Sequence, residues 1–555
     1  MPEANGPPSA APANNARSSP QLQHEAHAMW VAPARRAGMA LPAAIAAGAG
    51  IVHAVSFAPA DLPWLELLAL AACFALALLA RNVREAFAAG FAFGIGWFGV
   101  GVSWVYISLH HYGELWAPLA AGATAALVAF LALYPGLALA AAAWIGVRAS
   151  AQRALAIVAA WTLSEWLRGV LLGGFPWLST GYAHTDGSLA GFAPVIGVYG
   201  VGAVAALVVA MPLWAWFRSP RRPLPVLIAG VACIVLLATG AVLREQLWSQ
   251  PHGANLRVRL VQGNIAQEVK FAEGGLDESL TRYLPALRTG SMQGNSVALG
   301  PDLIVLPESA FPVPVNELPD DVLQVLADAR LRGGAALIFG AFVAEPGQRY
   351  FNSAIGLAGD EVEPQRYSKR HLVPFGEFIP FGFRWFVDLM RIPIGDQQRG
   401  ARYQPPLALA GQQIAVTICF EDLFGAELLD AWHDPSRTPT VLLNLSNLAW
   451  FDDSIALPQH LQISRMRTLE TARPMLLATN TGITAIVDAR GRVASQLPVQ
   501  TQGSLDGTVQ PTQGLTPFVR MGNWPILIAS ALALLVTIFS RPNPSEPRPP
   551  SRGRT

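Results

Sequence analysis

Charged side chains are scarce in this chain of 555 residues. They make up 14% of the sequence, whereas hydrophobic residues make up 52%. A soluble globular protein carries about 25% charged residues, so this composition excludes an ordinary soluble protein and indicates a membrane protein. The deficit is uneven, because residues 38–243 are overwhelmingly apolar while residues 250–515 have a globular composition.

Cysteine is also rare, with three residues in the chain. Cys73 and Cys233 lie in apolar segments, where a cysteine most simply packs as a small hydrophobic residue. Cys419 has no partner within residues 250–515, which excludes a disulfide framework there. A lone cysteine of this kind is either an inert buried residue or a nucleophile. Histidines and cysteines form no cluster with metal-ligand spacing, so we expect no metal and no other cofactor.

Lysine is rarer still, since only Lys270 and Lys369 occur among the 38 basic residues. A sequence so biased toward arginine has few reasons to keep a lysine. One reason is that the pKa of an ammonium group can be tuned, whereas a guanidinium stays charged. Lys369 lies in "RYSKRHLVPFGEFIP" with Glu377, and we interpret it as functional. We interpret Lys270 as a chance occurrence.

Long apolar runs are abundant. About 20 apolar residues cross a bilayer, and seven runs of this kind precede the globular region, with an eighth at 523–540. The seven runs are 38–57, 64–80, 86–108, 117–147, 154–172, 190–217 and 223–243. Residues 1–37 have the composition of a disordered tail, and residues 541–555 form a second tail. The sequence therefore predicts a polytopic α-helical membrane protein with eight transmembrane helices and an extramembrane domain at 250–515.

The distribution of arginine predicts the orientation in the membrane. Arginines cluster in both tails and after the second, fourth and sixth apolar runs. The alternate loops 58–63, 109–116 and 173–189 contain no Lys or Arg. We therefore expect both termini in the cytoplasm and the 250–515 domain outside it.

Two candidate reactive side chains directly follow predicted buried strands. Glu308 comes after "DLIVLP", in which Pro307 ends the strand. Cys419 comes after "IAVTI". In α/β folds, residues at the carboxyl ends of strands line the ligand crevice. A carboxylate at such a position is often only a capping or solvated group, so Glu308 alone is weak evidence of a site.

Glu308, Lys369 and Cys419, in this order, resemble the nitrilase superfamily. The matching segments are "LPESAF", "YSKRHLVPFGEF", "ICFEDLF", "NLSNLAWF" and "RPMLLATNTGITAIVD". In the apolar region, "SWVYISLHHYG" and "GGFPWLSTGYAHTDGSLAGFAPVIGVYGVG" resemble the membrane-bound branch of this superfamily, the apolipoprotein N-acyltransferases. The resemblance covers residues 38–540, and it implies an inserted nitrilase-like αββα sandwich at 250–515.

The resemblance also implies a catalytic triad. Cys419 would be the nucleophile that forms a thioester, Glu308 the general base, and Lys369 the group that stabilises the oxyanion. Glu377 and Glu421 match positions that support the triad. For both, a salt bridge to a nearby arginine is an alternative interpretation.

Three aromatic residues are expected to contact substrate on the same grounds. Phe271 stands where some members have Trp, and Phe420 stands where Tyr is frequent. Trp450 belongs to "NLAWF", in which Leu448 replaces a common Asp. These departures leave the triad intact and affect the contacts of the substrate pocket.

The implied function is the transfer of an acyl chain from a phospholipid to the α-amino group of the N-terminal diacylglyceryl-cysteine of a lipoprotein. No nucleic acid partner is expected. One alternative is a membrane-tethered amidase for a small exported amide, and another is a transporter or receptor with a non-catalytic domain. The residues alone also leave open a Cys–His enzyme, for which the candidate bases are His252, His371, His433 and His460.

Several residues near the predicted outer interface allow two interpretations. Five aromatic residues either border a lipid entrance between the spans or form an ordinary aromatic belt, namely Trp104, Tyr106, Trp116, Trp177 and Tyr182. Glu165 is an ionisable residue in an apolar run, which suggests function by default, although pairing with Arg168 would explain it.

Overall fold

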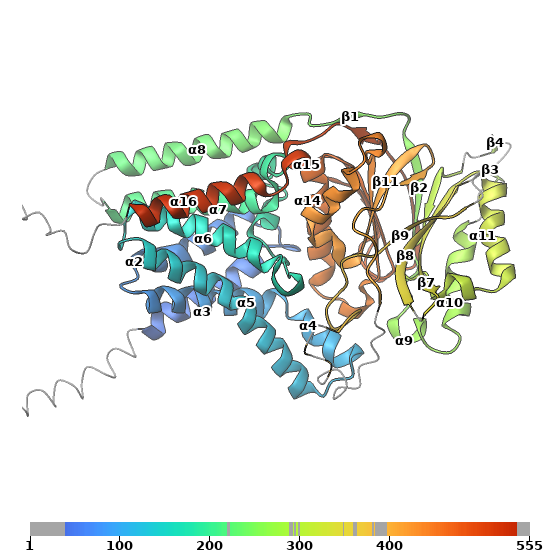
Figure 1. Ribbon diagram of the computed structural model, residues 1–555, viewed down its shortest axis with the longest axis horizontal. Coiled ribbons are helices and arrows are strands. Elements are labelled where there is room, and N and C mark those ends of the chain that lie inside the picture. Colours follow the sequence, from blue (N-terminus) through green and yellow to red (C-terminus); the bar gives the residue numbers. More distant parts are fainter. Residues whose placement is uncertain are drawn as a thin grey trace, which may run out of the picture.

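The computed structural model describes residues 39–218, 223–287, 300–347, 349–358, 363–379 and 397–540, with residues 292–293, 296–297, 382 and 384 between them. The predicted tails at 1–37 and 541–555 lie outside this part. Figure 1 shows a bundle of long helices beside a region built from two β-sheets and their covering helices.

Each predicted apolar run contains a helix. The helices are Met39–Val55, α2 (Pro63–Leu79), α3 (Val83–Gly101), α5 (Ala117–Ile145), α6 (Ala151–Arg168), α7 (Ala193–Arg218), α8 (Pro223–Glu245) and α16 (Trp524–Phe539). Three helical stretches, Ala117–Ile145, Ser188–Arg218 and Pro223–Glu245, are long and apolar enough to cross a membrane, or four if one bent pair counts as a single span. The sheets occupy the part of the chain between α8 and the short helix α15 (Pro517–Met521).

The bent pair corrects the prediction of one continuous span at 86–108. Helix α3 ends at Gly101, where the Val102 N–H donates to the Phe98 carbonyl. Helix α4 (Trp104–Ile107) and a π-helical turn at Ser108–Tyr112 then continue at an angle of 52° to α3. The residues stay apolar through the bend, so hydropathy alone does not reveal it.

The first sheet has seven strands in the order β16-β2-β5-β7-β8-β9, with β6 also paired to β7. Its strands are β2 (Leu256–Gln262), β5 (Leu303–Val305), β6 (Phe311–Pro314), β7 (Ala336–Glu345), β8 (Arg349–Leu357), β9 (Gln365–Ser368) and β16 (Gly503–Val509).

The second sheet has six strands in the order β10-β11-β12-β13-β14-β15. They are β10 (Leu407–Leu409), β11 (Gln412–Ile418), β12 (Val441–Ser446), β13 (Met475–Thr479), β14 (Ala485–Val487) and β15 (Val493–Gln496). Two small pairs complete the strands: β1 (Gln250–Pro251) with β17 (Thr512–Gln513), and β3 (Met292–Gln293) with β4 (Ser296–Val297).

The two sheets pack face to face. Val258 of the first sheet and Val416 of the second belong to one buried cluster between them. Helices α10 (Gly275–Tyr283) and α11 (Asp320–Gly333) cover the outer face of the first sheet, where Tyr283 and Val322 pack among strand residues. Helices α13 (Gly425–Leu428) and α14 (Ala456–Thr471) cover the second sheet. This arrangement is the predicted αββα sandwich.

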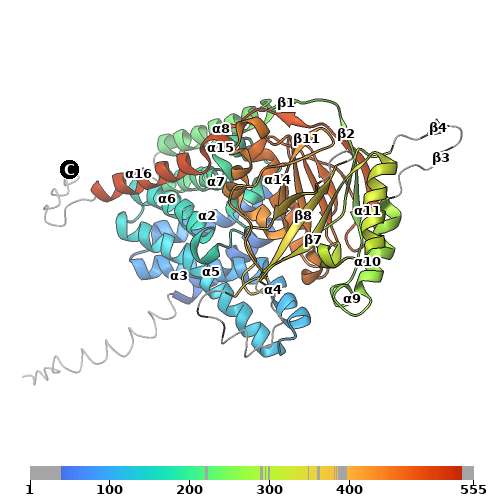
Figure 2. The same cartoon turned by 45° about the vertical axis from the view of Figure 1, so that its right-hand side comes forward.

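Helix α14 belongs to both halves of the molecule. Leu461 packs on the second sheet, whereas Ile463, Met466 and Leu469 belong to the apolar core of the helical bundle. Figures 1 and 2 show α14 at the junction between the two regions. A helix with apolar contacts on more than one side is typical of a buried position, and all but two of its sixteen residues are buried.

Parallel strands bring several chain segments to one end of the sandwich. Strands β2, β5 and β7 run parallel in the first sheet, and β11, β12 and β13 run parallel in the second. The segments after β5 and β11 contain Glu308 and Cys419. The carboxyl ends of parallel strands form a crevice where ligands bind, so the sheet topology positions a site there.

Candidate active site

Three predicted residues meet at this end of the sandwich. Glu308 follows β5, Lys369 directly follows β9, and Cys419 directly follows β11. The Nζ atom of Lys369 lies 3.4 Å from Oε1 of Glu308. The charges of both residues act on the pKa of the Cys419 thiol. The fold therefore brings together a carboxylate, an ammonium and a thiol from three separate segments.

The Glu308 carboxylate is held at both oxygens. Asn352 Nδ2 donates to Oε1 at 2.8 Å, and the backbone N–H of Asn447 donates to Oε2 at 2.7 Å. Gly340 faces the Glu308 backbone, where a Cβ atom on Gly340 would lie 2.6 Å from the Glu308 Cα. The neighbouring strand thus has no room for a side chain at this point, and the carboxylate has a fixed direction.

Lys369 is buried and ion-paired. Its Nζ atom lies 2.7 Å from Oε1 of Glu377, and its side chain is 1% exposed. Burial lowers the pKa of Lys369, but the nearby charges of Glu377 and Glu308 outweigh this effect and raise it above the ordinary value. Lys369 therefore stays an ammonium at neutral pH. Glu377 also accepts from the Val373 N–H at 2.8 Å, so it links Lys369 to the Val373 backbone. Its supporting role in the triad stays a prediction.

Cys419 begins a short 3₁₀ helix, Cys419–Leu423, with a φ of +53°. A non-glycine residue in this region of φ is uncommon, and such strain clusters at functional sites. Burial raises the pKa of the thiol, and the negative charge of Glu308 raises it further, whereas Lys369 and the Phe420 N–H lower it. The net shift is upward, so the resting thiol is neutral at neutral pH.

Glu421 ties the nucleophile segment to the lysine segment. Its carboxylate accepts from the backbone N–H groups of Ile418 at 2.8 Å, Arg370 at 2.7 Å and His371 at 3.0 Å. The Tyr367 hydroxyl donates to it as well, at 3.0 Å. These bonds place Glu421 between the two segments, and its supporting role in the triad stays a prediction. No arginine side chain is needed to explain it.

Lys270, interpreted from the sequence as a chance occurrence, lies beside Glu308 in the structure. It is fully buried at the end of α9 (Gln267–Lys270), and its Nζ atom donates to the Glu308 carbonyl at 3.1 Å. Burial lowers the pKa of Lys270 to about 7, and Glu308 counteracts this shift. Both lysines of the chain therefore lie beside Glu308.

The four candidate histidines lie in different environments. His460 Nε2 lies 3.4 Å from the carbonyl oxygen of Cys419. His371 is bonded to Glu427 and to the Gly173 carbonyl. His252 contacts Gln513, and the ring of His433 stacks on Tyr403. Of these four rings, that of His460 contacts the Cys419 segment, and the base for the thiol stays a prediction.

The three aromatic residues expected at the substrate pocket differ in exposure. Phe420 is buried, and its ring centroid lies 5.3 Å from that of Phe424. Phe271 and Trp450 are 48% and 40% exposed. The Trp450 ring lies edge-on to Tyr112, with a centroid distance of 5.9 Å. Substrate contact by all three stays a prediction.

Three aromatic residues assigned to the outer interface are instead buried between the helical bundle and the sandwich. Trp177 Nε1 donates to Gln459 Oε1 of α14 at 2.7 Å, and Trp104 packs against Trp177. The Tyr182 hydroxyl donates to the Leu423 carbonyl at 3.4 Å. These residues are therefore no ordinary aromatic belt, whereas Trp116 is 74% exposed.

Glu165 has the arginine partner that the sequence suggested. Its Oε1 atom lies 3.9 Å from Nη2 of Arg168 and accepts from the backbone N–H of Thr180 at 2.7 Å. Arg168 donates to the Phe175 and Trp177 carbonyls at 2.6 and 2.7 Å. The pair fixes the loop that carries Trp177, so a structural role explains both charges.

Comparison with known families matches both halves of the chain. Residues 49–211 match the apolipoprotein N-acyltransferase N-terminal domain, and residues 257–514 match the carbon-nitrogen hydrolase family. A crystal structure of a CN-hydrolase superfamily protein from Xanthomonas campestris is 17% identical, covers 50% of this chain and 97% of that chain, and has a TM-score of 0.34.

Relatives with similarity along the whole chain are more informative. The apolipoprotein N-acyltransferase of Ralstonia nicotianae is 46% identical over 92% of this chain and 95% of its own length. That of Bordetella bronchiseptica is 45% identical over 91% of this chain and 98% of its own length. That of Nitrosomonas europaea is 42% identical over 88% of this chain and 95% of its own length. Identity and coverage of this extent show that the chain belongs to the apolipoprotein N-acyltransferase family.

Proposed function

We propose that this protein transfers an acyl chain from a phospholipid to the α-amino group of the N-terminal diacylglyceryl-cysteine of a lipoprotein. The reaction proceeds through a thioester on Cys419. The observation that carries the proposal is the convergence of Glu308 and Lys369, 3.4 Å apart, on a thiol whose pKa both residues influence. Membership of the family supports the choice of substrates.

In the first half-reaction, Glu308 removes the proton of the Cys419 thiol, and the sulfur attacks the ester carbonyl of the phospholipid. The oxyanion that forms is stabilised by the Lys369 ammonium. A positioned donor of this kind contributes about 3 kcal/mol. The C–O bond of the ester then breaks. Glu308 returns the proton to the leaving alkoxide, so the products are a lysophospholipid and the acyl thioester.

In the second half-reaction, the α-amino group of the acceptor attacks the thioester carbonyl. Glu308 takes a proton from the amine as the C–N bond forms, and the C–S bond breaks. The proton is returned to the sulfur, which restores the thiol. The raised pKa of Cys419 suits this step, because a protonated thiol is a poor nucleophile and does not attack the new amide.

The membrane-tethered amidase is the less well supported alternative. An amidase needs the helical bundle only as a membrane anchor. In this protein the bundle also contacts the active-site region: Trp177 donates to Gln459, and the next residue, His460, contacts the Cys419 carbonyl. A lipid substrate stays in the bilayer, because each buried CH₂ contributes about 0.8 kcal/mol to membrane retention. An active site in contact with the helical bundle is therefore better placed for a lipid than for a small soluble amide. We place eight spans in a bacterial inner membrane, with the sandwich in the periplasm and both termini in the cytoplasm.

The test is transfer of a label in two stages. Purified protein in detergent is incubated with a phospholipid labelled in its acyl chain, and a synthetic diacylated peptide with a free N-terminus is then added. Label is expected on the α-amino group of the peptide, and an N-acetylated peptide should receive none. Free labelled fatty acid as the sole product would instead support hydrolysis and would reject the acyltransferase.

A further inference from the structure

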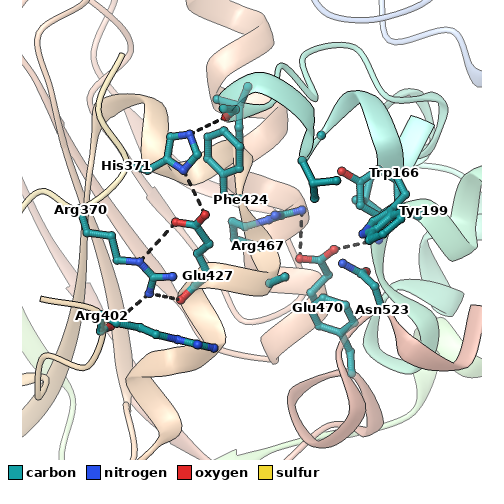
Figure 3. Close-up of a pocket in the computed structure, with 18 of the residues that line it drawn as sticks. Trp166, Tyr199, Arg370, His371, Arg402, Phe424, Glu427, Arg467, Glu470 and Asn523 are labelled. Carbon is teal, nitrogen blue, oxygen red and sulfur yellow. Dashed lines mark hydrogen bonds and ion pairs between the residues drawn. The ribbon is translucent and has the colours of Figure 1, made fainter. Parts of the chain in front are cut away.

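A cavity of about 460 Å³ lies between the helical bundle and the sandwich, behind the active site. Its bundle wall contains Trp166 and Tyr199, and its sandwich wall contains Arg370 and Glu427 (Figure 3). Neither Glu308, Lys369 nor Cys419 lines it. The cavity is therefore separate from the reacting groups, and the acyl transfer described above gives it no role.

Basic side chains dominate the charge of this cavity. Its charged lining consists of four arginines and two glutamates, namely Arg370, Arg399, Arg402, Arg467, Glu427 and Glu470. Asp430, which does not line the cavity, neutralises part of the positive charge. It pairs with Arg370 at 2.6 Å and with Arg402 at 3.3 Å. Among the described residues, Arg399 has no carboxylate within ion-pairing distance, and its guanidinium lies over the Phe378 ring. Glu427 also pairs with Arg370, at 3.4 Å. Four arginines therefore face three carboxylates, and Arg399 is the guanidinium left to meet an added anion.

Arg467 is a buried cationic residue in the lining of the cavity. Its side chain is 1% exposed, and Nη2 lies 3.0 Å from Glu470. Its Nε atom has no hydrogen-bond partner among the described residues. A buried donor without a partner is costly, and a ligand acceptor in the cavity would supply one. Gly425 makes room for this guanidinium, because a Cβ atom there would lie 2.1 Å from Nη1.

Exposed apolar side chains flank the cavity along the helical bundle. Val170, which lines the cavity, is 49% exposed, and Leu172 in the same loop is 84% exposed. On the other side, Asn523 lines the cavity and the next residue, Trp524, is 69% exposed at the start of α16. Exposed apolar residues beside a basic cavity form an amphipathic surface, as a lipid with a charged head group requires.

We propose that this cavity binds the phosphate-bearing head group of a membrane phospholipid, with the acyl chains lying along Val170 and Leu172. Arg399 and Arg402 hold the phosphate, since guanidinium groups match phosphate oxygens with paired hydrogen bonds. This lipid is bound and not consumed. The proposal rests on the membrane placement given above, and it does not depend on the thioester chemistry.

A lipid at this position would touch the segments that carry the active site. The backbone N–H of Arg370 donates to Glu421. Gly400, which lies between Arg399 and Arg402, donates its backbone N–H to the Lys369 carbonyl at 2.8 Å. On the other side, Phe424 lines the cavity at the end of the segment that begins with Cys419. A lipid in the cavity would therefore restrict the movement of the segments that contain Lys369 and Cys419.

The test is photolabelling of the full chain in a detergent without phosphate. The Cys419→Ala background prevents acyl transfer, and the probe is a phosphatidylglycerol with a photoreactive head group. Labelled peptides are expected to contain residues 166–174 or 397–404. In the Arg399→Ala/Arg402→Ala variant, labelling of these peptides should fall about tenfold, because charge-assisted bonds to the phosphate are lost.

Two further variants keep the proposal falsifiable. Arg349→Ala removes an exposed arginine that pairs with Glu345 away from the cavity, and labelling should be unchanged. Leu172 has a φ of +56°, which asparagine tolerates. Leu172→Asn therefore removes apolar surface with little backbone strain, and it should weaken labelling severalfold. Each variant is compared with the background protein for its thermal unfolding midpoint.

Three results would overturn the proposal. Equal labelling of 166–174 and 397–404 in the double-arginine variant would show that the guanidiniums do not hold the probe. Full displacement of the probe by millimolar inorganic phosphate would identify a site for free phosphate, not for a lipid. Labelling that maps only to other peptides would show that the cavity is empty of lipid. None of these results depends on whether Cys419 forms a thioester.

Discussion

The Nζ atom of Lys369 lies 3.4 Å from Oε1 of Glu308, so the proposed base and the proposed oxyanion-stabilising group form an ion pair. Lys369 has a closer partner, Glu377, at 2.7 Å. An ammonium has three donors, and these two carboxylates use two of them. The third donor is available to the oxyanion of a tetrahedral intermediate.

Glu377→Gln should slow the formation of the thioester about tenfold, because a charge-assisted bond to Lys369 becomes a neutral one. On the alkaline side of the pH profile, the activity of the variant should fall at a lower pH than that of the wild type. Glu377 raises the pKa of Lys369, and its loss lets the ammonium deprotonate earlier. The measurement is the rate of thioester formation between pH 7 and pH 11.

Glu345→Gln is the matched control, because Glu345 also pairs with basic side chains, Arg349 and Arg366, but lies outside the site. Its pH profile should match the wild type. If Glu377→Gln showed an unshifted alkaline limb, Glu377 would not set the charge state of Lys369.

His460→Gln should retain most of the activity. The ring nitrogen contacts the Cys419 carbonyl, and glutamine keeps a donor that can reach it, so we expect a loss of at most about tenfold from weaker positioning. His433→Gln, at a ring stacked on Tyr403 outside the site, serves as the control. A loss of thioester equal to that in Cys419→Ala would show that His460 is the base and would reject the role of Glu308.

Much of this site could be predicted because three segments resemble the nitrilase superfamily. Their positions near strand ends agree with the structure, in which Glu308 lies three residues after β5 and Cys419 directly follows β11. Asn352 and Asn447 could not be assigned, because an asparagine in a strand or a loop has many structural uses and their bonds to Glu308 depend on the tertiary fold. The position of Lys270 beside Glu308 could not be predicted, because its partner is a backbone carbonyl and a backbone carbonyl has no sequence signature.

Lys270→Met should change how the stability of the protein depends on pH. Burial lowers the pKa of Lys270 from 10.5 to about 7 in the folded chain. Between these two values the unfolded chain binds more protons, so this group makes the wild type more stable as the pH rises from 7 to 10.5. The variant lacks this contribution. Thermal unfolding midpoints in detergent at pH 7, 8, 9 and 10 should therefore show a difference, wild type minus variant, that grows with pH.

Parallel curves for wild type and Lys270→Met would contradict a lowered pKa for Lys270. Arg259→Met is a useful comparison, because Arg259 pairs with Asp506 on the outer part of the same sheet and a guanidinium does not titrate in this range. Its difference from the wild type should not vary with pH.

Trp177 and Gln459 should stabilise the protein as a pair. Gln459→Leu leaves the buried Trp177 N–H without its acceptor, which costs about 1–3 kcal/mol. Once Trp177→Phe has removed that donor, Gln459→Leu should cost less. A double-mutant cycle on thermal unfolding should therefore give a coupling of about 1 kcal/mol. Additive effects of the two changes would mean that the 2.7 Å bond does not join the bundle to α14.

The apolar runs predicted the places of the helices, but not their packing against the sandwich. Trp104 and Trp177 have the sequence environment of an interfacial belt, yet both are buried against one another and near α14. The bend after Gly101 was missed for a related reason, since the residues on both sides of it are apolar. Hydropathy measures transfer from water and does not distinguish lipid from a protein partner.

The central claim is that Cys419 carries the acyl chain, with Glu308 as its base. Wild type, Glu308→Gln and Cys419→Ala are each incubated with phospholipid alone, and the peptide containing residue 419 is examined by mass spectrometry. We predict one hydroxylamine-sensitive acyl group on Cys419 in the wild type, formation at least about a hundredfold slower in Glu308→Gln, and no acyl group in Cys419→Ala. An acyl group on another residue, or equal acylation of wild type and Glu308→Gln, would contradict the account.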